Sequence, residues 1–158
     1  MKERIALALV SVALAAPAAA QNARGEAKAT VAGKSVAIDY GRPSLRGRDM
    51  LGKAEVGTPW RLGADAATTL KTDADLDFSG VKVPKGEYTL TATKVDAAKW
   101  SLNVLGKGDA KVADIPLSSS TLSAPVETFT IELKGEKDKG ELSMSWGNLA
   151  MKAPFTAR

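Results

Sequence analysis

The sequence predicts an all-β protein whose single domain is an antiparallel β-sandwich or jelly roll. Short segments of alternating polar and apolar residues recur about every eight to twelve positions, with turn residues between them. After residue 20, no segment keeps the period of an amphipathic helix. The length of 158 residues is that of one ordinary domain, and its 44% of hydrophobic residues suffices for a core.

The first twenty residues have the pattern of a secretory signal. Lys2 and Arg4 give a positive start, 5–16 is an uncharged apolar run, and small residues follow up to position 20. We therefore expect cleavage of residues 1–20 before Gln21, and a periplasmic or secreted bacterial protein without membrane contact after cleavage. No Cys follows the apolar run, which excludes a lipid anchor on cysteine.

The mature chain is expected to begin with a loose tail over 21–27, followed by the folded domain over 28–156. Alternation from residue 28 to residue 40 predicts a hairpin that turns at Gly33. Residues 41–59 interrupt the alternation with glycine, proline and charged residues, and this segment predicts a long loop.

Alternation resumes at residue 67 and continues to the end of the chain. Strands are expected over 67–72, 75–78, 81–83, 87–93, 99–105, 112–117, 126–133, 141–146 and 149–154. Trp100 and Trp146 each alternate with polar neighbours on a predicted strand, so we expect both side chains in the core.

Composition excludes several kinds of site. The chain has no His and no Cys, so it lacks the commonest general base, the commonest metal ligand and any disulfide. The net charge of +4 is spread along the chain, so we expect no nucleic-acid partner. An EF-hand loop beginning at Asp73 fails because Phe78 stands where that loop needs glycine. We expect neither a metal nor a cofactor.

One cluster of polar and aromatic residues could bind a ligand. Four arginines lie between positions 42 and 61, beside tyrosine, tryptophan and aspartate side chains. Arginine binds carboxylate, phosphate or sulfate through a planar fork of donors, and aromatic rings offer flat faces to a sugar or a cation. The candidate ligand-binding residues are Tyr40, Arg42, Arg46, Arg48, Trp60, Arg61 and Asp65.

The same arginines have a structural interpretation. A long loop must satisfy its backbone carbonyls, and arginines that bond to them, or pair with Asp39, Asp49 or Asp65, would hold the loop in place. We place this interpretation slightly ahead of the ligand site, and both stay open. They differ in whether the side chains converge on one pocket.

Several motifs along the mature chain resemble one family of exported bacterial proteins. They lie at Tyr40–Arg48, Trp60–Thr69, Val83–Leu90, Lys99–Leu102, Ala124–Ile131 and Leu142–Trp146. The family is known as domain of unknown function 2911, and the resemblance covers about residues 26–155. It implies an all-β domain behind a signal peptide, and it implies neither an established activity nor catalytic residues.

The chain departs from the family's pattern at two places. Asp65 stands where the family usually has Asn or another polar residue, and the segment 49–59 is shorter than in members that carry an aromatic residue there. If the family's site binds an anion, Asp65 would weaken that role or occupy one arginine.

Three functions are compatible with these observations. The first is a binding or interaction module that holds a small anionic or carbohydrate-like ligand at the Arg/Trp loop. The second is a structural protein of the cell envelope without a small ligand. The third, which we rank last, is a hydrolase that uses two carboxylates from among Asp39, Asp65 and Glu127. The oligomeric state stays open.

Overall fold

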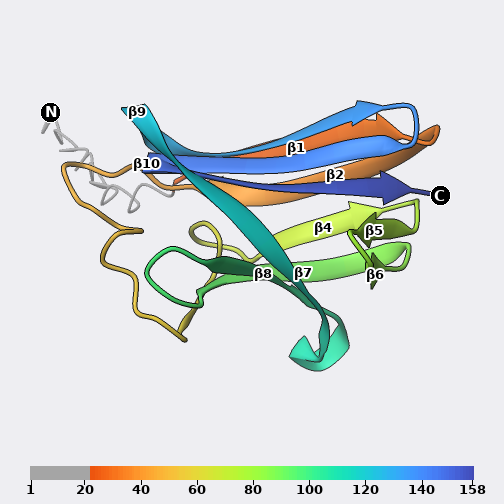
Figure 1. Ribbon diagram of the computed structural model, residues 1–158, viewed down its shortest axis with the longest axis horizontal. Coiled ribbons are helices and arrows are strands. Elements are labelled where there is room, and N and C mark those ends of the chain that lie inside the picture. Colours follow the sequence, from red (N-terminus) through yellow and green to blue (C-terminus); the bar gives the residue numbers. More distant parts are fainter. Residues whose placement is uncertain (1–21) are drawn as a thin grey trace, which may run out of the picture.

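The computed structural model describes residues 22–158, which form one all-β antiparallel domain with a short 3-10 turn, η1 (Lys107–Asp109) (Figure 1). The strands are β1 (Ala23–Val31), β2 (Lys34–Arg42), β3 (Pro59–Trp60), β4 (Thr68–Thr72), β5 (Leu76–Phe78), β6 (Val81–Val83), β7 (Gly86–Lys94), β8 (Trp100–Leu105), β9 (Lys111–Glu136) and β10 (Lys139–Ala157). The predicted all-β class and the single antiparallel domain are confirmed.

The strands form one continuous open sheet rather than the two sheets of a sandwich or jelly roll. Its order is β1-β2-β4-β7-β8-β9-β10-β5-β6, and β3 pairs with the end of β7. The length of β9 explains this continuity, because its residues 111–117 pair with β8 and its later residues pair with β10. In Figure 1, β9 accordingly crosses from the β7–β8 side of the molecule to the side of β1 and β10.

In two places, a pair of strands predicted as separate is joined in one long strand. β9 contains both 112–117 and 126–133, and β10 contains both 141–146 and 149–154. The alternation fails around Gly147 because the β9–β10 register shifts there, and this glycine adopts a φ of 60°. A β-bulge of this kind bends a strand without ending it.

The structure corrects the loose tail expected over 21–27. Residues 23–27 belong to β1, which pairs with β2 in a register that places Ala23 opposite Arg42 and Glu26 opposite Asp39. Ala27 is buried against the core. The small and polar residues of this segment have the composition of a tail, but they also suit a strand that covers the core with one face.

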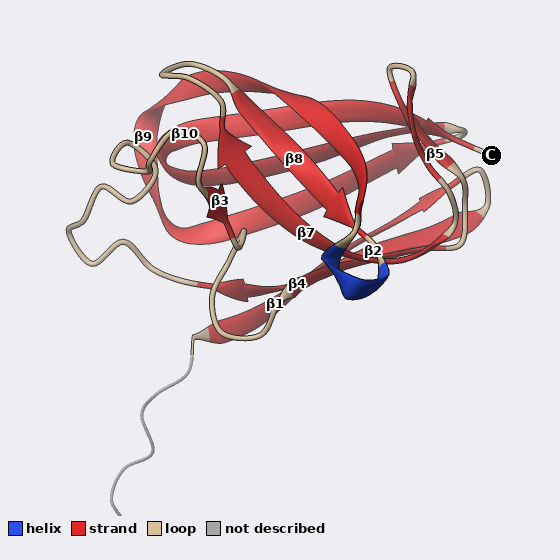
Figure 2. Ribbon diagram, turned by 90° about the horizontal axis from the view of Figure 1, so that it is seen from below, coloured by secondary structure: helices blue, strands red, loops and turns tan. Residues whose placement is uncertain are grey.

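The hydrophobic core is built from alternate residues of the strands, which curve around it in Figure 2. On β2, Ile38 and Tyr40 are buried while Asp39 between them is exposed, as the alternation predicts. Trp100 and Trp146 expose only 4% and 2% of their surfaces, which confirms both as core residues.

The predicted signal segment, residues 1–20, lies outside the described residues. Among residues 22–158, no helix is long and apolar enough to cross a membrane.

Candidate functional site

The candidate residues lie in three separate places and do not converge on one pocket. One group surrounds Phe129, one lies on the long loop over residues 43–58, and one lies on the turn over residues 61–67. Several of these side chains bond to backbone carbonyls, as the structural interpretation predicts. That these seven residues bind a ligand stays a prediction.

Tyr40 and Arg42 satisfy the backbone of β9. The buried Tyr40 hydroxyl accepts a hydrogen bond from the Ile131 amide at 2.9 Å and donates one to the Ile131 carbonyl at 3.3 Å. Arg42 Nε donates to the Phe129 carbonyl at 3.1 Å, and its Nη2 donates to Thr130 Oγ1 at 3.1 Å. These two side chains therefore attach the end of β2 to the middle of β9.

Trp60 belongs to an aromatic cluster rather than to an open site. Its ring lies nearly parallel to that of Trp146, with the centroids 5.8 Å apart and the planes at 15°. It also meets Trp100 and the buried Phe129 edge to face. One face of Trp60 is therefore used in packing, and the cluster holds β3 against the hairpin of β9 and β10.

Arg46 and Arg48 extend from the long loop and are exposed. The Arg46 backbone amide donates to Glu127 Oε1 at 3.0 Å, so this residue is held through its backbone and not its guanidinium. Arg48 Nε donates to the Leu45 carbonyl at 2.9 Å, and its Nη2 donates to the Ser44 carbonyl at 3.4 Å. Arg48 thus holds its own loop while its remaining donors face solvent.

Arg61 and Asp65 lie on the third segment, and both are exposed. Arg61 Nη1 donates to the Asp65 carbonyl at 3.0 Å, which closes the turn on itself. The Asp65 carboxylate accepts a hydrogen bond from the backbone amide of Asn22 at 3.0 Å. Asp65 therefore occupies no arginine guanidinium among the described residues.

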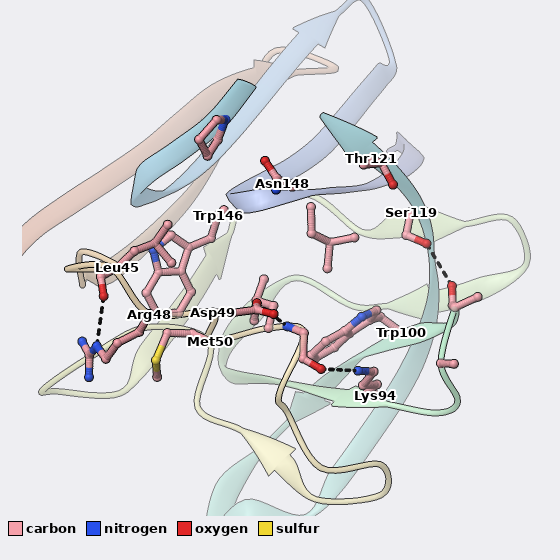
Figure 3. A pocket seen from close by; sticks show the side chains of 17 residues that line it. Leu45, Arg48, Asp49, Met50, Lys94, Trp100, Ser119, Thr121, Trp146 and Asn148 are labelled. Atoms are coloured by element: carbon pink, nitrogen blue, oxygen red, sulfur yellow. Dashed lines mark hydrogen bonds between the residues drawn. The ribbon is translucent and has the colours of Figure 1, made fainter. Parts of the chain in front are cut away.

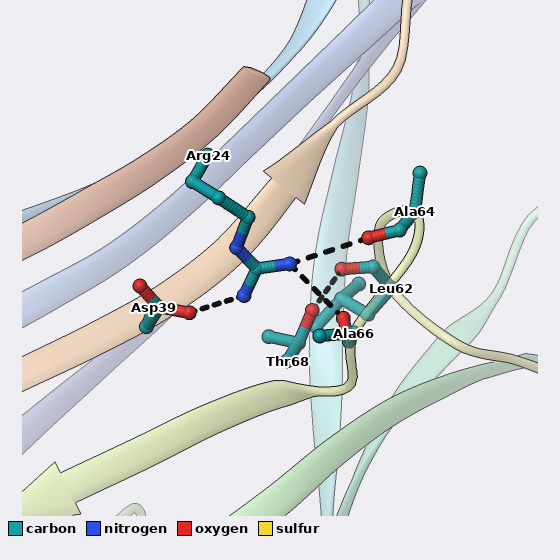
Figure 4. A network of polar contacts seen from close by, with 6 residues as sticks. All are labelled: Arg24, Asp39, Leu62, Ala64, Ala66 and Thr68. Atoms are coloured by element: carbon teal, nitrogen blue, oxygen red, sulfur yellow. Dashed lines mark hydrogen bonds and ion pairs between the residues drawn. The ribbon is translucent and has the colours of Figure 1, made fainter. Parts of the chain in front are cut away.

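Arg24 holds the same turn, and sequence reasoning missed it (Figure 4). Its Nη1 donates to the carbonyls of Ala64 and Ala66, at 3.3 Å and 3.1 Å, while its Nη2 pairs with Asp39. Inside the turn, Thr68 Oγ1 donates to the Leu62 carbonyl at 2.6 Å. A sequence signal existed, because positions 24 to 31 alternate in the way β1 requires.

A pocket of about 440 Å³ opens between the long loop and the β9–β10 hairpin (Figure 3). We call it the loop pocket. Its lining comprises Leu45, Arg48–Gly52, Lys94, Ala97, Ala98, Trp100, Ser119, Thr121, Pro125 and Trp146–Leu149. Of the predicted site residues, Arg48 is the one in this lining, and the volume falls within the range of small-molecule sites.

The loop pocket forms where the β9–β10 ladder is interrupted. Residue pairing stops at Thr121 opposite Leu149 and resumes at Val126 opposite Gly147, so the intervening residues of β9 bulge outward. Asn148 faces this gap and is exposed. Bulges are frequent beside functional sites because they redirect side chains and free backbone groups from the ladder.

Hydrogen bonds fix the polar groups around the pocket. Asp49 Oδ1 accepts from the Gly52 amide at 2.9 Å, and Lys94 Nζ donates to the Gly52 carbonyl at 3.3 Å. Trp146 Nε1 donates to the Glu127 carbonyl at 3.1 Å. The loop is thereby tied to the end of β7, and the indole of Trp146 is fixed in orientation.

The carboxylates expected for a hydrolase are each engaged elsewhere. Asp39 pairs with Arg24, Asp65 binds the Asn22 amide, and Glu127 binds the Arg46 amide. The acid that lines the loop pocket is Asp49. No two carboxylates therefore line the loop pocket, so this pocket does not offer the pair of carboxylates that a glycosidase uses.

The acidic segment that begins at Asp73, which does not fit an EF-hand loop, carries its carboxylates at the surface. Asp73 and Asp75 are exposed, whereas the alternating residues Ala74 and Leu76 are buried. The two carboxylates therefore lie on an outward face. In the described part of the chain, no cluster of three or more potential metal-binding side chains is present.

Within residues 22–158, two side chains have clearly shifted pKa values, and both lie away from the loop pocket. The hydrogen bond from the Gly80 amide, followed by that from Lys82, holds the pKa of Asp77 below its usual value of 3.8. Burial, followed by the nearby charge of Asp75, raises the pKa of Tyr88 above 10.0. Both residues stabilise turns next to the short strands β5 and β6.

The fold and the pocket define an all-β protein with a small-molecule-sized cavity beside a bulged hairpin. The chain belongs to the DUF2911 family, because the model of that family, described as "Protein of unknown function (DUF2911)", matches residues 22–155. This match confirms the resemblance seen in the sequence. No curated protein and no solved structure matches the chain.

Proposed function

We propose that the protein is an exported binding module that holds a small anionic or carbohydrate-like ligand in the loop pocket. The observation that carries the proposal is the pocket itself, which is formed by a long loop, an interrupted strand ladder and two tryptophans. Long ordered loops on a rigid sheet are common places for binding residues. Binding rather than catalysis is proposed because the lining offers a single carboxylate and no histidine or cysteine.

A structural envelope protein without a small ligand is the second candidate. It is favoured by the arginine contacts, since Arg24 and Arg42 use their guanidinium groups to hold carbonyls of neighbouring segments. Such contacts stabilise irregular chain without any ligand. The two candidates differ in whether a small molecule stabilises the protein through the loop pocket.

A thermal-shift screen of the purified protein against small anions and neutral sugars tests the proposal. Ala97 is exposed on the pocket wall, so Ala97→Phe would fill part of the cavity. Ala110 is exposed beside η1, and Ala110→Phe is the matched control. A true ligand at a hundred times its Kd stabilises the native state by about 2.7 kcal/mol.

The proposal predicts that at least one compound raises the melting temperature of the wild type and of Ala110→Phe, and that Ala97→Phe abolishes this response. Stabilisation that persists in Ala97→Phe would place the ligand elsewhere, and a screen without any response would favour the structural candidate. Export is tested separately by intact mass, since the proposal requires a processed protein that begins at Gln21.

A further inference from the structure

We infer that the ligand of the loop pocket is an organic carboxylate with an apolar body, rather than a sugar or an inorganic anion. The inference rests on the proposed function and deepens it, because it names the chemical class that the lining fits. It follows from three features of the pocket: the covered faces of its indoles, its apolar wall, and the balance of its charges.

The indoles of the pocket are placed poorly for a sugar. A sugar ring stacks on an open aromatic face, but Trp146 exposes 2% of its surface and Trp100 exposes 4%. Trp60 covers one face of Trp146 at a centroid distance of 5.8 Å. The tryptophans therefore offer the pocket a buried apolar base and not a stacking platform.

Apolar side chains form much of the remaining wall. Leu45 and Leu149 are half-buried. Met50, on the loop that lines the pocket, is 37% exposed (Figure 3). Pro125 and Ala97 lie in the same lining. A ligand that covered these groups would remove apolar surface from water, which an inorganic anion cannot do.

The charged groups of the wall favour a monoanion. Arg48 and Lys94 bond only to backbone carbonyls and form no ion pair with any carboxylate in residues 22–158. The Asp49 carboxylate is held by the Gly52 amide. Two cations against one anion leave one positive charge, which a ligand carboxylate would neutralise with charge-assisted hydrogen bonds.

Lys94 is the cation best placed to meet that carboxylate. Its Nζ holds the Gly52 carbonyl by a long bond of 3.3 Å, and its ammonium group has two further N–H donors. Its backbone carbonyl accepts from the Gly57 amide at 2.9 Å, so the loop stays attached to β7 when the side chain turns to a ligand. Arg48, a residue of the loop itself, provides a second cation in the lining (Figure 3).

Intrinsic tryptophan fluorescence gives a direct test, because the chain has 3 tryptophans and they form one cluster at this pocket. The probes are octanoate below its micellar concentration, 1-octanol, acetate, inorganic phosphate and glucose. Octanoate carries both features of the inferred ligand, octanol has the apolar body alone, and acetate has the charge alone. Octanoate is expected to bind at least about tenfold more tightly than each of the other probes.

Variants assign the binding to the pocket. Lys94→Met keeps the apolar stem and removes the charge, and we expect it to weaken octanoate binding about tenfold or more. The matched control is Lys107→Met in η1, at the opposite end of β8 from Trp100, which is expected to bind like the wild type. If Lys94→Met does not fold, as judged by its melting temperature, Arg48→Met serves as the second variant with the same expected direction.

The possible outcomes separate the inference from the proposed function. Binding of glucose or phosphate but not of octanoate would overturn the inference and leave the proposed function intact. Equal binding of octanol and octanoate, or equal octanoate binding in Lys94→Met and the wild type, would also overturn the inference. A lack of response to every probe here and in the thermal-shift screen would contradict both.

Discussion

Tyr40 and Arg42 show how single side chains stabilise an open sheet. β9 pairs with β10 on one side, and its residues 127–131 also bond to the Tyr40 hydroxyl, the Arg42 guanidinium and the backbone of Pro43 and Leu45. A buried backbone amide or carbonyl without a partner is costly. These contacts therefore replace a neighbouring strand along part of β9.

Tyr40→Phe tests this role, because it removes the hydroxyl that both accepts from and donates to Ile131. The change leaves a buried amide unsatisfied, and we expect a loss of about 1–3 kcal/mol in the free energy of unfolding, measured with urea. The control is Tyr88→Phe, where the lost bond to the Pro84 carbonyl lies at the surface, and we expect a loss of less than about 1 kcal/mol. A loss for Tyr40→Phe that is no larger than the loss for Tyr88→Phe would contradict the role given to the buried contact with Ile131.

A second prediction compares two arginines of the predicted site. Arg42→Lys removes the planar fork that joins Phe129 and Thr130, so stability should fall by about 1–3 kcal/mol. Arg61 is exposed and makes one bond within its own turn, so Arg61→Lys should change stability by less than about 0.5 kcal/mol. A large loss for Arg61→Lys, with none for Arg42→Lys, would reverse the roles assigned to them.

The candidate residues are clustered in the sequence, but in the structure they lie in three separate places. Residue types and spacing point to arginines that can hold a loop, and Arg42 and Arg48 do so. Lys94 could not be found in this way because it reaches the pocket from β7, far along the chain. Arg24 does not stand out in the sequence, because the composition of residues 21–27 predicts a tail and not the start of β1.

The loop over residues 43–58 and the β9–β10 hairpin form the pocket together. The sequence predicts the loop and the strand segments of the hairpin, but not the bulge between them. The loop follows from glycine, proline and charge in the sequence. The interrupted alternation at Gly147 and Asn148 marks the bulge, but the same interruption also fits a gap between two separate strands. A register shift depends on which strand lies opposite, and the sequence of β10 alone does not contain that information.

The β5–β6 hairpin is predicted to be acid-sensitive through Asp77. Its pKa is lowered in the folded state, mainly by the Gly80 amide and then by Lys82. The resulting stabilisation is present above the pKa of the unfolded chain and is lost as the pH falls through the lower folded value. Urea unfolding from about pH 6 to about pH 2 should therefore show a steeper loss of stability below about pH 4 in the wild type than in Asp77→Asn.

Lys82→Met is the informative companion variant, because it removes the second cause of the shift and keeps the Gly80 hydrogen bond. In Lys82→Met, most of the extra loss of stability below about pH 4 that distinguishes the wild type from Asp77→Asn should remain. Identical acid profiles for the wild type and Asp77→Asn would contradict the role of this carboxylate.

For the whole molecule, the sequence predicted an antiparallel all-β domain but not that its strands form one continuous sheet. Alternation and turn residues predicted most strands within one or two positions, including β4, β6 and β8. They could not show that β9 is one strand shared between β8 and β10, because the alternation of residues within a strand does not identify the strands that pair with it. The expected sandwich is therefore an open sheet, while the buried faces agree with the prediction.

The central claim is that the loop pocket is the ligand site of this protein. The most direct measurement is a ¹H–¹⁵N NMR titration with a compound that raises the melting temperature, observing the indole N–H signals of the 3 tryptophans. Two of these residues, Trp100 and Trp146, line the pocket. Their signals should shift in proportion to occupancy while the amides of β5 and β6 stay unchanged. Shifts confined to β5, β6 or the outer strand faces, with unmoved indole signals, would contradict the claim.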